Sequence, residues 1–316
     1  MAALDERTAR MGLACVVEPG DPRLGQLLAD YAAAEVWASL TGPSAPGAWA
    51  RRAAAVDLDV VRQATADGGL GFVVPGDPQW PAGLDALDRC DPVQESRGAP
   101  VGLWVRGCGD LAALVERSVA IVGSRASSAY GDHVASDLAA GLAGTGITVV
   151  SGGAYGIDAA AHRGALAVTG PTVAVVAGGL DEPYPRAHAE LFERIAEVGL
   201  IVSEVAPGDH PTRRRFLTRN RLIAALTQGT VLVEAAARSG ARNTASWASA
   251  CGRPLMAVPG SVHSATSVTP HRLIRDGEAV LVTRTDDVRA VVGPLGAALP
   301  LEYSPAHLLD RLTPEQ

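Results

Sequence analysis

From residue 118 onward, apolar runs alternate with segments of helical spacing. Runs rich in Val, Ile and Leu predict buried strands: SVAIVG (118–123), ITVVSGG (147–153), TVAVVAGG (172–179), LIVSEV (200–205), TVLVEA (230–235) and PLMAVPG (254–260). The intervening segments predict helices at 130–146, 156–170, 188–199, 218–229 and 241–252. Near-continuous apolar strands that alternate with helices are typical of a sheet covered on both faces. The pattern therefore predicts an α/β fold with a doubly wound, mainly parallel sheet.

The two ends of the chain differ from this pattern. DPRLGQLLADYAAAEVWASL (21–40) and AWARRAAAVDLDVVRQATADGG (48–69) have helical spacing, and a Pro/Gly-rich break separates them. We predict a small helical domain over residues 1–71 and the α/β domain over 72–292. Residues 293–316 begin with GPLGAALP, which indicates a linker or the start of a further domain.

Composition narrows the class of protein. The chain is 47% hydrophobic, which is ample for a large core, and its four cysteines lie apart without metal-ligand spacing. We therefore expect reduced thiols and no metal site. No signal-peptide pattern or membrane-spanning apolar run is evident, so we expect a cytoplasmic protein that does not enter a membrane. The formal net charge is -7, which counts against nucleic acid as a partner unless positive charge gathers locally.

Candidate binding loops follow the predicted strands, because parallel sheets bind ligands beyond the carboxyl ends of their strands. GSRASSAYG (123–131) and SGGAYGID (151–158) contain small residues that let a backbone approach an anion. A third candidate loop, GGLDEPYPRAH (178–188), also directly follows a predicted strand. Ser124, Ser127 and Ser128 are possible donors to a phosphate. A simple tight turn explains the first loop equally well. The chain has neither GxGxxG nor GxxxxGK[ST], so the usual dinucleotide and P-loop signatures are absent.

Four ionisable residues near the strand ends are candidates for catalysis. Asp158 and His162 are four residues apart on one helix face, and Glu204 and Glu234 each lie at a strand end. No third partner or nucleophile accompanies the first pair, so we expect it to be structural. We expect the two glutamates to anchor loops by bonding to arginines such as Arg219 or Arg221.

The run RRRFLTRNR (213–221) is the most unusual segment. It contains five arginines and one of only three phenylalanines, although the chain is acidic. Positive charge at the start of a helix is unfavourable unless an anion is bound there. Arginines around an aromatic ring suit single-stranded nucleic acid, because charge follows the backbone while a base stacks on the ring. The same cluster also suits a small phosphate ligand, and the residues alone leave both possibilities open.

Several motifs in fixed order make the chain resemble the DNA-processing protein A family (DprA, also called Smf). They include VAIVGSRASSAYG, VVSGGAYGIDAAAHRGAL, LIVSEVAPGDHPTRRRFLTRNRLIAAL and VLVEAAARSGARNTASWASACGRPLMAVPG, and they span roughly residues 72–285. The resemblance implies an extended Rossmann-like fold with a helical, SAM-like N-terminal domain. It also implies a binding protein without catalysis or cofactor. Such a protein holds single-stranded DNA in natural transformation and recombination, forms a homodimer and helps load RecA recombinase.

The resemblance also implies a set of DNA-binding residues. They are Gly123, Ser124 and Arg125 of the first loop; Gly152, Gly153 and Gly156 of the second; Arg213, Phe216, Arg219, Asn220 and Arg221 of the arginine run; and Ser239 and Gly240 of the SG turn. Phe216 takes the position of the base-stacking ring. Arg219, Asn220 and Arg221 are expected to divide between binding surface and loop anchor. The dimer surface is expected around residues 260–285.

The chain departs from the family pattern at three places. Tyr155 stands where an arginine is frequent, and Leu217 where a proline is frequent. The segment near Thr269 and Pro270 lacks a glycine that is frequent there. Many members continue into a C-terminal winged-helix domain, which residues 293–316 would begin.

The competing prediction is a Rossmann-like nucleotide sensor or a phosphoribohydrolase-type enzyme. The latter would need a PGGxGTxxE-type loop, and GTVLVEAAARSG has its Glu234 in a different arrangement.

Overall fold

The computed structural model describes residues 4–43 and 45–293. These residues contain one nine-stranded sheet in the order β1-β2-β6-β5-β4-β3-β7-β8-β9. The strands are β1 (Gly71–Val73), β2 (Leu103–Gly107), β3 (Ser118–Val122), β4 (Thr148–Ser151), β5 (Thr172–Val176), β6 (Leu200–Ser203), β7 (Thr230–Leu232), β8 (Leu255–Ala257) and β9 (Val280–Leu281). In this order, each strand from β6 through β5, β4, β3, β7 and β8 to β9 pairs in parallel with the next, whereas the pairs β1–β2 and β2–β6 are antiparallel. The predicted doubly wound, mainly parallel α/β sheet is confirmed.

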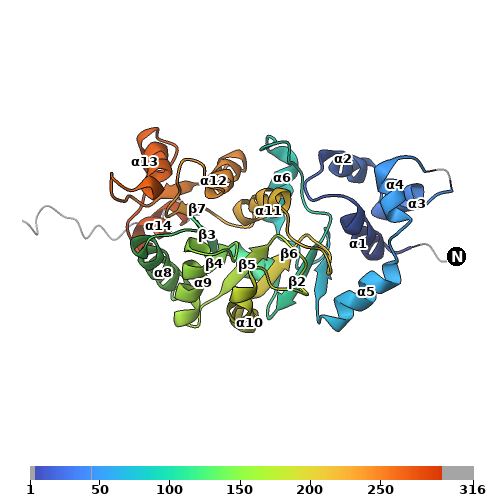
Figure 1. Cartoon of the computed structure of the whole chain (residues 1–316), viewed down its shortest axis with the longest axis horizontal. Helices are drawn as coiled ribbons and strands as arrows, with labels where there is room; N and C mark the ends of the chain where they lie inside the picture. The colour runs from blue at the N-terminus through green and yellow to red at the C-terminus, as the bar shows by residue number, and fades with distance from the viewer. Residues whose placement is uncertain (1–3, 44, 294–316) are drawn as a thin grey trace, which may run out of the picture.

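The described helices either cover a face of this sheet or, in the N-terminal region, pack together at one end of it (Figure 1). They are α1 (Glu6–Val16), α2 (Pro22–Asp30), α3 (Ala33–Leu40), α4 (Gly47–Ala53), α5 (Leu58–Asp67), η1 (Ala82–Asp85), α6 (Ala86–Arg89), α7 (Leu111–Glu116), α8 (Ala129–Ala143), α9 (Ile157–Ala167), η2 (Arg186–His188), α10 (Ala189–Val198), α11 (Arg213–Ala225), α12 (Ala241–Ala250), η3 (Ala265–Ser267), α13 (Val268–Arg275) and α14 (Thr285–Val292).

Alternate residues of the central strands enter two separate cores. Ala120 and Val122 of β3 pack with α11, α12 and α13, whereas Val119 and Ile121 pack with α8, α9 and α14. Figure 1 shows α11, α12 and α13 on one side of the sheet and α8, α9 and α10 on the other. Because both faces are covered, the strands have no polar face, which explains their continuous apolar sequence.

The N-terminal region is helical as expected, but it divides into more helices than the two predicted runs. The first run forms α2 and α3, and the second forms α4 and α5, while α1 precedes both. The chain is extended at Tyr31 and Ala32, and Glu35 accepts a bond from the Ala32 amide at 2.9 Å. Asp57 caps α5 by accepting from the amides of Asp59 and Val60. These caps end one helix and begin the next inside a continuous alanine-rich pattern.

Helix α11 begins five residues earlier than predicted. The expected start was residue 218, whereas the helix begins at Arg213 behind the cap residue Thr212. The Thr212 hydroxyl accepts from the amide of Arg215 at 3.2 Å, and its carbonyl accepts from the amide of Phe216 at 3.0 Å. The charged first turn has no apolar periodicity, so the spacing of hydrophobic residues could not reveal it. Three arginines therefore occupy the first turn of the helix.

The fold brings five loops to one edge of the sheet, which we call the carboxyl edge. They are the segments 123–128, 152–156, 177–188, 204–212 and 233–240, which follow β3, β4, β5, β6 and β7. The strand order runs outward from β3 in both directions, so the switch in direction lies between β3 and β7. Ligands of doubly wound sheets bind at such an edge, next to the switch point. The segment 293–316 was expected to be a linker or the start of a further domain, and all of it after Gly293 lies outside the described residues.

Candidate functional site

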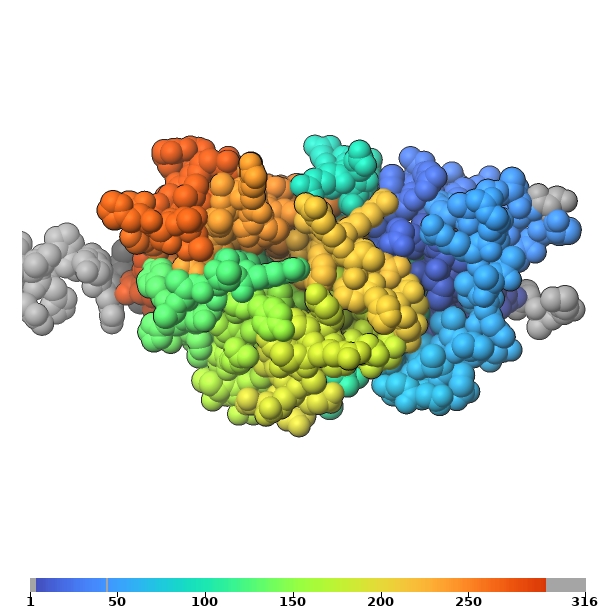
Figure 2. Space-filling view, viewed as in Figure 1, coloured from blue at the N-terminus to red at the C-terminus, as the bar shows by residue number. Residues whose placement is uncertain are grey.

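The centre of the carboxyl edge is a stack of Arg125 on Phe216. The guanidinium carbon of Arg125 lies 4.4 Å from the centre of the Phe216 ring. Arg125 comes from the loop after β3, and Phe216 from the first turn of α11, so the two meet across the loops between them. Figure 2 shows the green segment that follows β3 extending over the surface to the gold segment that contains α11. Tyr184, from the loop after β5, contacts the same phenylalanine with ring centroids 5.7 Å apart.

The five arginines of the run 213–221 have different environments. Arg213 and Arg214 are exposed, Arg215 is partly buried, and Arg219 and Arg221 are buried. Successive helical residues are turned by about 100° around the axis, so a short run of like residues reaches every side of α11. Only part of the predicted cluster therefore faces solvent.

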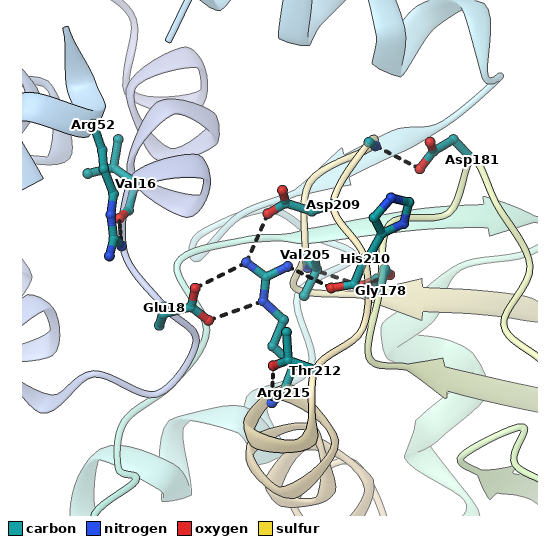
Figure 3. Close-up of polar contacts among 12 residues, drawn as sticks. Val16, Glu18, Arg52, Gly178, Asp181, Val205, Asp209, His210, Thr212 and Arg215 are labelled. Atoms are coloured by element: carbon teal, nitrogen blue, oxygen red, sulfur yellow. Dashed lines mark hydrogen bonds and ion pairs between the residues drawn. The ribbon is translucent and has the colours of Figure 1, made fainter. Parts of the chain in front are cut away.

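Arg215 connects the N-terminal helices to the first turn of α11 (Figure 3). Its guanidinium bonds both carboxylate oxygens of Glu18, at 3.1 and 3.2 Å, and also Asp209 at 2.9 Å and the carbonyl of His210 at 3.0 Å. The side chain is only 13% exposed. Although burial opposes the shift, these carboxylates raise the pKa of Arg215 above its usual value. This arginine is committed to contacts within the protein.

Arg221 and Glu204 form a buried ion pair between α11 and the end of β6. The Arg221 side chain is 0% exposed and that of Glu204 is 7% exposed. Two bonds join them, from Nη1 to Oε2 at 2.8 Å and from Nη2 to Oε1 at 2.5 Å. The anchoring role expected of Glu204 is thus what the structure shows.

Arg219 lies beneath the glycine loop after β4. Its Nη1 donates to the Val175 carbonyl at 2.8 Å, and a Cβ on Gly152 would lie 1.8 Å from that nitrogen. Burial lowers the pKa of Arg219 to about 10, while Asp158 opposes this shift and Arg125 adds to it. The guanidinium stays charged at neutral pH, so the glycine loop has a fixed positive charge under it. Gly152 is required because a side chain would collide with this arginine.

Asp158 and His162 of α9 have structural positions. Asp158 accepts from the amides of Gly152 and Ala154 at 3.1 and 3.4 Å, and burial raises its carboxyl pKa. Thr172 gives its hydroxyl proton to a carbonyl, so His162 donates through Nδ1 to the Thr172 oxygen at 2.8 Å. Burial lowers the pKa of His162 to about 3. Neither side chain is placed to act on a ligand at the surface.

Glu234 anchors the first loop, but its partners are not the predicted arginines. Its carboxylate accepts from the amide and hydroxyl of Ser128, at 2.9 and 2.6 Å, and from the Thr266 hydroxyl at 2.9 Å. Gly123 lies against the Glu234 backbone: a Cβ there would be 2.9 Å from its carbonyl oxygen. The expectation of an arginine partner was wrong because β7 pairs with β3, which places Glu234 beside the loop that follows β3.

The serines of the first loop bond within the protein. The hydroxyl of Ser124 donates to the Ala126 carbonyl at 3.0 Å, and that of Ser127 donates to Asp132. Together with Ser128 bound to Glu234, these bonds hold the turn in place. The side chain in this loop that reaches over the site is that of Arg125.

The remaining predicted residues shape the loops around the stack. Gly153 and Gly156 have φ of 65° and 73°, a left-handed backbone that favours glycine. Asn220 is buried and donates to the Gly240 carbonyl at 3.4 Å and to Asn243 at 3.2 Å. Ser239 accepts from the amide of Ala241 at the start of α12. All thirteen predicted residues therefore lie at or just beneath the carboxyl edge, and Gly123, Gly152, Arg219, Asn220 and Arg221 support the surface from below.

Two residues of the site had no place in the sequence prediction. Tyr184 lies in the candidate loop 178–188, but the sequence prediction gives this residue no role. Glu18 belongs to the N-terminal region, and no pattern connects it to Arg215 almost two hundred residues later. A tyrosine in a loop directly after a predicted strand is the sequence signal that could have identified Tyr184.

Comparison with known proteins identifies the family. A family model described as DNA recombination-mediator protein A matches residues 71–293, which is more than half of the chain. The chain belongs to this DNA recombination-mediator protein A family. Within the described residues of this family member, no helix has the length and apolar character needed to cross a membrane. The same residues contain no group of three or more His, Cys, Asp and Glu side chains able to hold a metal ion.

Individual members of the DprA/Smf group agree with this assignment. The chain is 49% identical over 265 residues to a putative DNA processing protein DprA from Mycobacterium tuberculosis, covering 82% of this chain and 66% of that protein. It thus spans just under two thirds of that relative. The crystal structure of DprA from Streptococcus pneumoniae superposes with a TM-score of 0.73 at 31% identity, over 92% of this chain and 98% of that one.

A second similar structure belongs to a protein whose ligand is stated. DNA processing protein A from Helicobacter pylori has a TM-score of 0.59 and 28% identity, over 70% of this chain and 95% of that one. That protein is described by its single-stranded DNA binding mode. The similarity places this chain in the same fold and family.

Proposed function

We propose that this recombination-mediator family member binds single-stranded DNA along its carboxyl edge, without catalysing a covalent step or using a cofactor. The observation on which the proposal depends is the stack of Arg125 on Phe216 at the start of α11, with Arg213 and Arg214 exposed in the same turn. Guanidinium groups beside a partly exposed aromatic ring suit a strand whose phosphates are neutralised while its bases stack. The single-stranded DNA binding described for the H. pylori relative supports the same ligand.

Charge in the first turn of α11 supports an anionic ligand. Among the described residues, Arg125 and Arg213 form no ion pair, whereas Arg215 and Arg221 each have carboxylate partners. Unpaired arginines at a helix start face the positive end of the helix dipole, which costs free energy until an anion binds. The buried charge of Arg219 adds to the same positive potential. A phosphate at this edge would therefore stabilise the helix start.

The alternative function, a nucleotide sensor or phosphoribohydrolase, has less support. A nucleotide in a doubly wound sheet would place its phosphate near the switch point between β3 and β7. Glu234 occupies that position, and its carboxylate is satisfied by Ser128 and Thr266. A buried carboxylate there would repel a phosphate, which favours a ligand that lies over the outer surface instead.

We also propose that the chain forms a homodimer and assists RecA recombinase. Support for the dimer comes from Val262, Val268, Val280 and Leu281, which are 47% to 80% exposed and lie within the predicted surface of 260–285. Four large apolar side chains exposed within residues 262–281 favour an interaction surface in this part of the chain. Light scattering on the protein and on Leu281→Arg tests the dimer, and a strand-exchange assay tests help to RecA.

The main experiment measures binding of a labelled poly-dT oligonucleotide and of a matched duplex over a salt series. We expect preference for the single strand, and a slope of log affinity against log salt of about -0.7 per neutralised phosphate. Phe216→Ala should cost roughly 1–3 kcal/mol, the usual value of one base–aromatic stack. Arg213→Ala should reduce the slope, whereas the exposed Arg62→Ala on α5 is the matched control. No binding by the wild type at low salt would refute the proposal.

A further inference from the structure

Tyr184 is an exposed aromatic ring next to Phe216 with no assigned role. It lies in the loop after β5 and is 52% exposed. Its ring is tilted by 54° to that of Phe216, with centroids 5.7 Å apart. An aromatic side chain that only filled space in the core would be buried, so this ring is available to a ligand.

The two rings are not equally accessible to a base. Arg125 already lies over the Phe216 ring at 4.4 Å, so a base that stacks there must move this guanidinium aside. Phe216 itself is half-buried, so less of its ring is open to a base. About half of the surface of Tyr184 is open to solvent, and no cation–π contact covers its ring among the described residues. A base can therefore stack on Tyr184 without the displacement of Arg125.

We propose that Tyr184 is a second stacking platform for a base of the bound single strand, beside the one at Phe216. This inference rests on the proposed function. The two rings and Arg125 then form one continuous apolar and cationic surface across the loops after β3, β5 and β6. Successive bases of a strand can stack on such a surface without being read by hydrogen bonds, because every base has a π-face.

The loop that contains Tyr184 is held in place before any ligand arrives. Asp181 accepts from the amide of Gly208 at 2.9 Å, and the Gly178 carbonyl accepts from the Ser203 hydroxyl at 2.7 Å (Figure 3). The first bond connects this loop to the segment after β6, and the second connects it to the last residue of β6. A platform that is already ordered costs less conformational entropy on binding than a mobile one.

Nearby acidic residues favour a base rather than a phosphate at this ring. Glu182 pairs with Arg186 at 3.3 Å, and Asp209 pairs with Arg215 at 2.9 Å. These pairs leave little net positive charge around Tyr184, in contrast to Arg213 and Arg125. The phosphates should therefore follow the arginines, with bases turned towards the tyrosine.

The test compares Tyr184→Ala and Tyr184→Phe with the wild type and with Phe216→Ala. The ligands are an oligo-dT and an abasic oligonucleotide of the same length, which keeps the phosphates and removes the bases. Tyr31→Ala is the matched control, because Tyr31 is 56% exposed and lies in the N-terminal region, between α2 and α3. Thermal melting of every variant checks that it is folded.

We expect Tyr184→Ala to weaken oligo-dT binding roughly 5- to 150-fold, as for loss of one base stack, with an unchanged salt slope. Tyr184→Phe should bind within about twofold of the wild type, because the ring and not the hydroxyl is used. The loss should disappear with the abasic ligand. An equal loss on the abasic ligand would assign Tyr184 a structural role and overturn the inference.

Two further outcomes separate this inference from the proposed function. If Phe216→Ala binds weakly and Tyr184→Ala binds like the wild type, the second platform is refuted and the DNA-binding edge stands. If the wild type itself does not bind oligo-dT, the proposed function fails and the inference falls with it.

Discussion

Removal of Glu204 should destabilise the protein more than removal of any exposed charge. In Glu204→Leu, the fully buried guanidinium of Arg221 would lose both of its bonds to carboxylate. Two unit charges about 4 Å apart at an effective dielectric constant of about 20 attract by about 4 kcal/mol. Measured costs of breaking one partner of a buried pair are about 3–5 kcal/mol, which agrees with this value. For a chain of this size, the melting temperature should fall on the order of 10 °C.

Urea and thermal unfolding, followed by the fluorescence of the buried Trp104 and Trp247, measure this effect. The decisive comparison is the double variant Glu204→Leu/Arg221→Met. Apolar side chains of similar volume often replace a buried ion pair at little cost, so the double variant should recover most of the lost stability. A single variant within about 1 kcal/mol of the wild type would contradict the reasoning. So would a double variant as unstable as the single one.

Three further changes test other parts of the structure. In Gly156→Ala, the alanine has to adopt a φ of 73° and place its Cβ 2.3 Å from the Ser124 carbonyl oxygen. The melting temperature should fall clearly. An unchanged melting temperature would contradict the close approach of these two loops. His162 has a folded pKa of about 3, below its unfolded value, so its contribution to the free energy of unfolding is complete above about pH 6.5 and is lost as pH falls towards 3. Between pH 7 and 5 this loss amounts to about 2 kcal/mol. His162→Gln should therefore flatten the free energy of unfolding against pH over this range. Glu18→Gln removes one carboxylate partner of Arg215. Because Glu18 is partly exposed, the free energy of unfolding should fall by about 1 kcal/mol or less, and oligo-dT affinity should change little. A large loss of affinity would show that the N-terminal helices control the binding edge.

The class of fold follows from the sequence because both faces of the sheet are buried. Each central strand, such as Ser118–Val122, is apolar throughout, and helices of regular spacing connect the strands. The pattern predicts less where few apolar residues are involved. The two-residue β9 is too short to have a periodicity, and the start of α11 consists of arginines. The capping contact of Thr212, and not hydrophobic spacing, sets that start.

The candidate site could be predicted as a set of residues but not as an arrangement of side chains. The loops after parallel strands meet at one edge whatever their sequence, which is why the predicted residues lie together. Which glutamate meets which group depends on strand order: Glu204 reaches Arg221, whereas Glu234 reaches Ser128 because β7 pairs with β3. Local sequence holds no information on that pairing.

The sequence by itself determined that an acidic chain gathers five arginines around one phenylalanine in a run of nine residues, and this composition specifies the chemistry of the edge. Only the tertiary structure decided the use of each arginine. Arg213 faces solvent, Arg215 is bound by Glu18, and Arg221 is buried against Glu204. The physical reason is the rotation of about 100° per residue, which turns neighbouring side chains towards different parts of the fold. The carboxylates that bind Arg215 and Arg221 come from other segments of the chain, and only the folded chain brings them together.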